Sequence, residues 1–376
     1  VYPPTYVYRV IWWNLADVDD HERFPSQELE TGPSDFEFRH ELDEARVAAL
    51  FEAQSEVDHL DEFLASRETQ AFLVIQDDAI LYERYFNGAS RDSIVTSFSV
   101  AKSFVSALVG IAIGEGKIAS VHDPITRYLP ELVQRDSRFA EITIENLLRM
   151  SSGIRYQEFP FLTGDDAKTY YYPDLRTLAL EHTEIAGEPG SAFLYNNSHP
   201  LLLGLILERA TGVPVAEYLQ EKIWKPLGME YPGSWSLDST ETGFPKMESG
   251  INARAIDFAR FGRLYLNEGD WGGRQIVPAA WVAESTRVKP APDRGSYYPE
   301  DFELPSGKLG YGYMWWGICR DEGDCDFAAE GNLGQLIYVS PRSRLIIVKN
   351  SSGYGDLSWH QWDDLFSRVA AAFASP

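Results

Sequence analysis

Residues 97–118 read SFSVAKSFVSALVGIAIGEGKI and contain the only S-x-x-K motif in the 376 residues of the chain. Apolar residues recur after the motif at helical spacing, which predicts a buried helix that begins near Ser99. Ser99 and Lys102 are three positions apart, so they lie about one turn from each other on the same helix face. Burial and the positive end of the helix dipole both disfavour an ammonium ion there. We therefore expect Lys102 to be a neutral amine that takes a proton from the Ser99 hydroxyl.

Strand-like segments lie toward both ends of the chain. Apolar runs at residues 71–76 and 79–86 are separated by Asp77 and Asp78, a pattern typical of a β-hairpin. Further apolar runs follow near the C-terminus, at residues 311–317, 335–339 and 345–348. The region between is mainly helical in pattern. Strands at both ends with helices between them predict an α/β lobe formed by both termini, with a helical lobe inserted.

The length predicts more than one compact unit, because a single hydrophobic core stops growing at about 250–300 residues. We expect an N-terminal arm at residues 1–40, an α/β lobe made of residues 41–118 and 251–376, and a helical lobe at residues 119–250. The arm is read as extended. Its apolar run YVYRVIWW, residues 6–13, is read as a strand that lies on the body of the protein, and a segment that follows a cleaved signal or anchor is the alternative.

The composition excludes several classes of partner. The net charge is −24, so the chain lacks the positive field that binds nucleic acid phosphates. No run of about 18 apolar residues occurs, so we expect no membrane-spanning segment in this chain. The seven histidines lack metal-ligand spacing and no nucleotide-binding motif occurs, so we expect neither a metal nor a cofactor.

The two cysteines suggest a compartment. Cys319 and Cys325 flank a predicted hairpin tip, where a disulfide is geometrically reasonable. Such a bond favours a periplasmic or secreted location over the cytoplasm. The sequence leaves both a monomer and a homodimer open.

Two further motifs follow the S-x-x-K pair. Tyr195-Asn196-Asn197 precedes an apolar run at residues 201–210, and such a pair can bring a phenol and an amide donor to one site. Residues 330–335 (EGNLGQ) lead into the run LIYV, where an edge strand can offer a backbone N–H to a substrate oxygen. Each segment also fits an ordinary turn with no catalytic role.

In this order the three motifs resemble those of the serine β-lactamase and penicillin-recognising hydrolase superfamily. The Y-x-N form is similar to that of the class C and family VIII esterase branch. Longer phrases are similar to the 6-aminohexanoate-dimer hydrolase subgroup, namely YNNSHPLLLGLILERATG, IWKPLGMEYPGSWSLD and ARAIDFARFGRLYLNEG. The resemblance covers roughly residues 65–350. It implies a two-lobed β-lactamase-like fold of the α/β (α+β) class, with an antiparallel sheet flanked by helices and an inserted, mainly helical lobe.

The resemblance implies a role for each motif residue. Ser99 would be the acyl-forming nucleophile, and Lys102 would take its proton. Tyr195 would pass a proton to the leaving group and later help to activate water. Asn197 would orient Lys102 or the substrate. The backbone N–H groups of Ser99 and Gln335 would form the oxyanion hole.

The third motif departs from the family pattern. Asn332 stands where relatives have lysine or histidine, and Leu333 replaces a hydroxyl residue. The cation that commonly meets a substrate carboxylate is therefore missing, which disfavours penicillins and D-alanyl peptides. The other candidates for the substrate-binding wall are Tyr156, Tyr170, Trp315, Trp316, Gly334 and His360. For the aromatic residues among them, an ordinary core position remains an equal alternative.

The predicted function is hydrolysis of small carboxylic esters or short linear amides through an acyl-enzyme on Ser99. The alternative within the same chemistry is a β-lactamase or a D-alanyl carboxypeptidase. The alternative from another class is a catalytically inactive binding module of the same fold. The expected partner is thus a small-molecule ester or amide.

Overall fold

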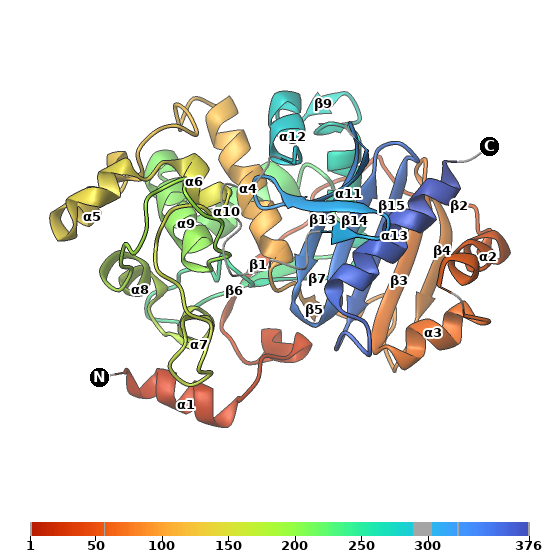
Figure 1. Cartoon of the computed structure of the whole chain (residues 1–376), viewed down its shortest axis with the longest axis horizontal. Helices are drawn as coiled ribbons and strands as arrows, with labels where there is room; N and C mark the ends of the chain where they lie inside the picture. The colour runs from red at the N-terminus through yellow and green to blue at the C-terminus, as the bar shows by residue number, and fades with distance from the viewer. Residues whose placement is uncertain (1, 56, 289–302, 322, 375–376) are drawn as a thin grey trace.

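The computed structural model of the chain describes residues 2–55, 57–288, 303–321 and 323–374. Among these residues, nine strands form one large sheet in the order β10-β11-β12-β13-β14-β15-β3-β4-β2 (Figure 1). Neighbouring strands pair antiparallel except β2 and β4, which run parallel. In chain order the strands are β2 (Arg39–His40), β3 (Thr69–Gln76), β4 (Ala79–Tyr85), β10 (Glu303–Leu304), β11 (Gly307–Tyr311), β12 (Trp316–Asp321), β13 (Asp324–Gly331), β14 (Gln335–Ser340) and β15 (Leu345–Ser351).

Helices cover both faces of this sheet. α11 (Ala255–Leu266) packs on one face against β14, β15 and β3. α13 (Trp359–Phe373) lies on the other face, with α2 (Glu44–Ser55) and α3 (Leu60–Ser66) beside it (Figure 1). Strands buried on both faces read as continuous apolar runs, which is the pattern of residues 71–75 and 345–348. The predicted hairpin of β3 and β4 is confirmed, as are the strands at β14 and β15.

The helix α4 (Val100–Gly114) lies between the large sheet and the remaining helices (Figure 1). It packs against β13 and β14 on one side and against α9 (Ser198–Thr211), α10 (Val215–Leu219) and α12 (Ala279–Ser285) on the others. Gly110 permits the approach of α12, because a Cβ at this position would lie 2.3 Å from the Trp281 ring. The other helices in this region are α5 (Pro130–Arg135), α6 (Ile144–Leu148), α7 (Asp165–Tyr171) and α8 (Leu175–Glu181).

A smaller sheet supports the start of α4. Its order is β1 (Ser26–Leu29), β6 (Gly233–Ser236), β7 (Ile251–Ala253) and β5 (Val95–Thr96). The strand β5 ends just before Ser99, so this sheet fixes the chain as it enters the helix. A third sheet pairs β8 (Asp270–Trp271) with β9 (Arg274–Gln275).

Two expectations about secondary structure are wrong. Residues 6–13 do not form a strand, because α1 (Pro4–Trp12) is a helix with proline at its start. Its buried residues Tyr6, Arg9 and Val10 follow helical spacing and face α7. The run at residues 311–317 is also not one strand. β11 ends at Tyr311, and β12 begins only at Trp316, after Met314 at a φ of 60°.

The two cysteines of the chain are bonded to each other. Cys319 and Cys325 form a disulfide that joins the paired strands β12 and β13.

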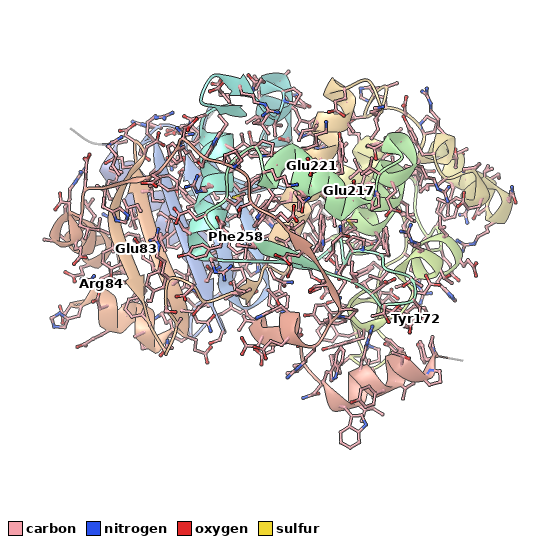
Figure 2. All side chains as sticks on the ribbon, turned by 180° about the vertical axis from the view of Figure 1, so that it is seen from behind. Glu83, Arg84, Tyr172, Glu217, Glu221 and Phe258 are labelled. Atoms are coloured by element: carbon pink, nitrogen blue, oxygen red, sulfur yellow. A yellow bond between two sulfur atoms is a disulfide. The ribbon has the colours of Figure 1, made fainter. Side chains whose placement is uncertain are left out.

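Phe258 on α11 is buried, whereas the acidic Glu217 and Glu221 are exposed (Figure 2). None of the helices within the described ranges is long and apolar enough to cross a lipid bilayer. The division into an arm, an α/β lobe and a helical lobe stays a prediction.

Candidate active site

Ser99 lies at the start of α4, in a cleft of about 480 Å³. Phe98 precedes it at a φ of 47°, a conformation that a bulky residue rarely adopts and that often marks a functional site. This turn lets Ser99 face the cleft while Phe98 is buried and stacks on Tyr170, with ring centroids 6.2 Å apart. The local sequence therefore places a hydroxyl at the N-terminal end of a buried helix.

Lys102 lies beside Ser99, as their spacing predicts. Its Nζ is 2.6 Å from Ser99 Oγ and 3.1 Å from the backbone oxygen of Glu248. The residue is 1 % exposed. Burial lowers the pKa of Lys102 to about 7, and the charges of Glu248 and Asp166 offset part of the fall. A large fraction of Lys102 is therefore an uncharged amine at neutral pH.

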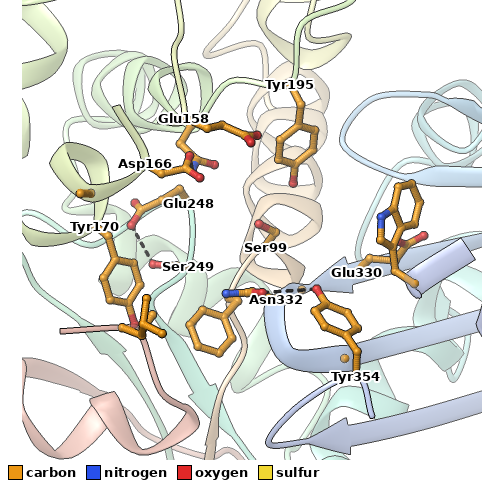
Figure 3. Close-up of a pocket in the computed structure, with 18 of the residues that line it drawn as sticks. Ser99, Glu158, Asp166, Tyr170, Tyr195, Glu248, Ser249, Glu330, Asn332 and Tyr354 are labelled. Atoms are coloured by element: carbon orange, nitrogen blue, oxygen red, sulfur yellow. Dashed lines mark hydrogen bonds between the residues drawn. The ribbon is translucent and has the colours of Figure 1, made fainter. Parts of the chain in front are cut away.

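Tyr195 completes the group. In Figure 3 its hydroxyl points toward Ser99, and its ring centroid lies 4.9 Å from Lys102 Nζ. The ring is stacked on Trp316 at 6.0 Å between centroids. Burial raises the pKa of the Tyr195 phenol, while a hydrogen bond with Ser99 lowers it in part. Tyr195 therefore holds its proton at neutral pH and can donate it.

Asn197 contacts a carboxylate rather than the lysine. Its Nδ2 donates to Asp166 Oδ1 at 3.2 Å, and the hydroxyl of Tyr156 donates to the same oxygen. Asn197 and Asp166 line the cleft, while Tyr156 lies behind them and is buried. The Y-x-N motif thus places Tyr195 beside Ser99 and Lys102, and Asn197 in a neighbouring wall of the cleft.

The third motif forms the turn between β13 and β14 in the middle of the large sheet. The expectation of an edge strand is therefore wrong, because β14 pairs with β13 on one side and with β15 on the other. Asn332 and Gly334 line the cleft, and Leu333 between them has a φ of 59°. Gln335 opens β14, and its buried side chain donates from Nε2 to the backbone oxygen of Ser351. The assignment of the oxyanion hole to the N–H groups of Ser99 and Gln335 stays a prediction.

The aromatic candidates divide into two groups. Tyr170 and Trp316 line the cleft, whereas Tyr156, Trp315 and His360 are not among the residues that line it. Trp315 is fully buried, and its ring centroid lies 4.4 Å from that of Tyr265, so it is a core residue. The ring of His360 packs on Trp359. Tyr156 contacts the cleft lining through hydrogen bonds with Asp166 and Asn197.

Sequence reasoning missed the acidic character of the cleft. Within the described ranges, the charged side chains that line it are all carboxyl groups, those of Glu158, Asp166, Glu248 and Glu330. Burial and the charge of Asp166 raise the pKa of Glu158 to about 7. Tyr354 and Trp359 also line the cleft. In a chain with 57 acidic residues, no pattern distinguishes these positions before the fold is known.

Comparison with known proteins places this geometry in context. The profile of the Beta-lactamase family matches residues 57–358. The 6-aminohexanoate-dimer hydrolase of Paenarthrobacter ureafaciens is 28% identical over 329 residues, which cover 82% of this chain and 79% of that protein. Esterase EstB of Burkholderia gladioli is 29% identical over 227 residues, which cover 54% of this chain and 56% of that protein.

A solved structure is also similar to the structure of this chain. A Bacillus anthracis protein provisionally named as a 6-aminohexanoate-dimer hydrolase superposes with a TM-score of 0.78 at 25% sequence identity. The superposition covers 99% of this chain and 94% of that chain. The expected fold class, an α/β fold with an antiparallel sheet flanked by helices, is confirmed by this similarity.

Proposed function

The chain belongs to the Beta-lactamase family, and from this premise we propose that it is a serine hydrolase of small carboxylic esters or short linear amides. Curated relatives carry hydrolase and esterase names, which supports hydrolysis as the reaction class. The observation that carries the proposal is the 2.6 Å approach of the buried Lys102 amine to the Ser99 hydroxyl. A buried amine with a pKa near 7 is a suitable general base at neutral pH.

Acylation begins when Ser99 Oγ attacks the carbonyl carbon of the substrate. Lys102 Nζ accepts the Oγ proton as the new C–O bond forms. The carbonyl oxygen becomes an oxyanion, which the backbone N–H groups of Ser99 and Gln335 would stabilise. When the tetrahedral intermediate collapses, the leaving group takes a proton from the Tyr195 hydroxyl, and Lys102 can then return its proton to Tyr195. The product of this half-reaction is an ester of Ser99.

Deacylation repeats the same steps with water as the nucleophile. Water gives a proton to the neutral amine of Lys102, and the hydroxide formed attacks the acyl carbon. When the tetrahedral intermediate collapses, Ser99 Oγ leaves and takes this proton from Lys102, directly or by way of the Tyr195 hydroxyl, and the carboxylic acid product departs. Tyr195 and Lys102 thus serve both half-reactions.

The wall of the cleft supports a substrate without a carboxylate near the reacting bond. Among the described residues, no arginine, lysine or histidine side chain lines the cleft, and Asn332 occupies the position where a cation is common in relatives. A substrate carboxylate would meet the acidic side chains of the wall without a counter-charge. Esters and neutral amides meet no such penalty.

Labelling with a fluorophosphonate probe tests the nucleophile. The wild type should be labelled, and Ser99→Ala should not. Ser103→Ala is the matched control, because Ser103 lies one turn further along α4, is buried and donates to the backbone oxygen of Met314. This variant should still be labelled. An unlabelled wild type would favour the inactive binding module.

A substrate panel tests the reaction class. p-Nitrophenyl butyrate should be hydrolysed faster than nitrocefin, and the linear dimer of 6-aminohexanoate tests whether a linear amide is also cleaved. Turnover of nitrocefin alone would contradict the proposed substrate class and favour the β-lactamase alternative.

A further inference from the structure

A pair of carboxyl groups lies at one wall of the cleft without a cation. Glu330, at the end of β13, lines the cleft, and Asp363 on α13 lies behind it and is fully buried. Within the described ranges, Glu330 Oε1 and both Asp363 oxygens find no hydrogen-bond partner other than a contact between the two carboxyl groups. The wall therefore holds two neighbouring acids that lack a counter-charge.

Such a pair has two stable states. Two buried carboxylates cannot both be ionised unless a cation joins them, so otherwise they hold protons. Burial raises the pKa of Asp363 to about 8, and burial together with Asp363 raises the pKa of Glu330 well above its usual range. Lys349 is not the missing cation, since its Nζ is 2.7 Å from Ser351 Oγ and packs over Trp362. Without a cation beside them, the carboxyl groups of Glu330 and Asp363 therefore hold protons. A ligand cation can take the place of these protons.

Aromatic rings line the same cleft as Glu330, namely those of Trp316, Tyr354 and Trp359. The rings of Trp316 and Trp359 are 4.8 Å apart, and Trp316 also stacks on Tyr195. Figure 3 shows Glu330 and Tyr354 on one side of Ser99, with Glu158 and Asp166 on the other. Aromatic faces around a carboxyl group are the usual surroundings of a bound quaternary or alkylated ammonium ion.

We propose that Glu330, together with Trp316, Tyr354 and Trp359, binds an alkylammonium group on the leaving group of the substrate. The inference rests on the proposed function, because the proton donated by Tyr195 goes to the leaving group. The leaving group must therefore depart beside Tyr195, and Trp316 continues the wall from Tyr195 to Trp359. The substrate class is that of aminoalkyl esters, and of the corresponding amides.

Paired esters of equal shape test the subsite. Butyrylcholine carries a trimethylammonium group, and 3,3-dimethylbutyl butyrate carries a neutral tert-butyl group in its place. The wild type should prefer the choline ester in kcat/KM by about tenfold, the size of a desolvated cation–π and charge contact. Glu330→Gln should bring the ratio close to one.

A matched variant separates the two sides of the cleft. Glu158→Gln removes a carboxyl group on the opposite side of Ser99 and should keep the preference for the choline ester. Equal rates for the two esters in the wild type would overturn the proposal, as would an unchanged ratio in Glu330→Gln.

A binding measurement decides the case without turnover. Tetramethylammonium chloride should change the tryptophan fluorescence of Ser99→Ala in a saturable way, because Trp316, Trp359 and Trp362 line the cleft. Sodium chloride at equal ionic strength should not, and Ser99→Ala/Glu330→Gln should lose the response. A saturable response of Ser99→Ala, together with a wild type that the fluorophosphonate does not label, would keep the subsite and reject the hydrolase. Labelling without such a response would reject the subsite and keep the hydrolase.

Discussion

Lys102 combines burial with a position beside Ser99, and this determines how its protonation varies with pH. The neutral fraction of the amine increases as the pH rises through about 7, the pKa of Lys102. We therefore predict that kcat/KM for p-nitrophenyl butyrate rises from pH 5 to pH 8, with a midpoint near 7. Ser103→Ala should give the same profile. A rate that does not change over this range would remove Lys102 as the base.

Tyr195 offers a substitution that removes one atom. Tyr195→Phe deletes the hydroxyl but keeps the ring stacked on Trp316. We predict that kcat falls by about 10²–10⁴, the usual contribution of a positioned proton donor, while KM changes little. Steady-state kinetics with a neutral ester measures both constants. A variant with unchanged kcat would exclude Tyr195 from the proton transfer.

The same lysine also makes stability depend on pH. Lys102 has a pKa of about 7 in the folded protein and 10.5 as its ordinary value, so between these pH values the unfolded chain binds the extra proton. The contribution of Lys102 to the free energy of unfolding therefore rises with pH in this window, by at most about 1.4 kcal/mol per pH unit.

Lys102→Met isolates the contribution of Lys102 to the free energy of unfolding, because the other buried lysines are the same in the variant and in the wild type. The variant should be more stable than the wild type at pH 7, by on the order of 1–3 kcal/mol, and this advantage should shrink toward pH 10. Urea denaturation at pH 7, 8.5 and 10 measures both effects. An advantage that grows with pH would contradict the assigned pKa.

At the level of elements, the contact between α4 and α12 depends on Gly110. Alanine normally stabilises a helix interior by up to about 1 kcal/mol relative to glycine. Here a Cβ would collide with the Trp281 ring, so we predict that Gly110→Ala destabilises the protein by about 1–3 kcal/mol. Urea denaturation measures the change.

Ser106→Ala on the same helix is the control for this prediction. Ser106 is fully buried, and its hydroxyl has no hydrogen-bond partner among the described residues. Its removal should be neutral or stabilising. If Gly110→Ala were also neutral, α12 would have to move away from α4 at little cost.

Elements with a clear apolar period were predictable from the sequence. The β3–β4 hairpin, α4, β14 and β15 are buried over most of their length, so each is visible in the sequence as a continuous apolar run whose length and flanking residues indicate its type. The expectation of a strand at residues 6–13 is wrong because the exposed apolar residues Tyr8, Ile11 and Trp12 obscure the helical spacing of the buried positions. Met314 interrupts residues 311–317 by backbone geometry, which no apolar pattern records.

The residues of the candidate site also divide into those that the sequence indicates and those that only the fold reveals. Ser99 and Lys102 share one helix turn, so their contact follows from spacing alone. Tyr195 reaches them from a distant segment, and only the resemblance between motifs indicated it. The carboxyl groups of Glu330 and Asp363 meet because α13 packs over β14 and β15, and β13, which carries Glu330, is the neighbour of β14. Tertiary packing alone brings them together, so no local pattern could indicate the pair.

At the level of the whole molecule, the N-terminal segment packs apart from the main core. Tyr6 and Val10 of α1 form a separate apolar cluster with Phe24, Ala167 and Tyr171. We predict that deletion of residues 1–13 lowers the free energy of unfolding by about 3–5 kcal/mol, the value of two buried side chains. The large sheet and fluorophosphonate labelling of Ser99 should persist.

Circular dichroism and the rate of labelling check this prediction. A rate within about threefold of the wild type would show that the site does not depend on α1. Loss of the folded spectrum would contradict the separation of the two clusters.

The pairing of β3 with β15 has a consequence for biosynthesis. Gln76 pairs with Leu345, so about 270 residues must be translated after β3 before its partner exists. At 5–20 residues per second, the ribosome needs roughly 15–50 s for this stretch. During that interval the nascent hairpin presents an open, apolar strand edge, which is a site for aggregation or chaperone capture. Slow elongation in the second half of the message therefore lengthens the vulnerable period and lowers the yield of native protein.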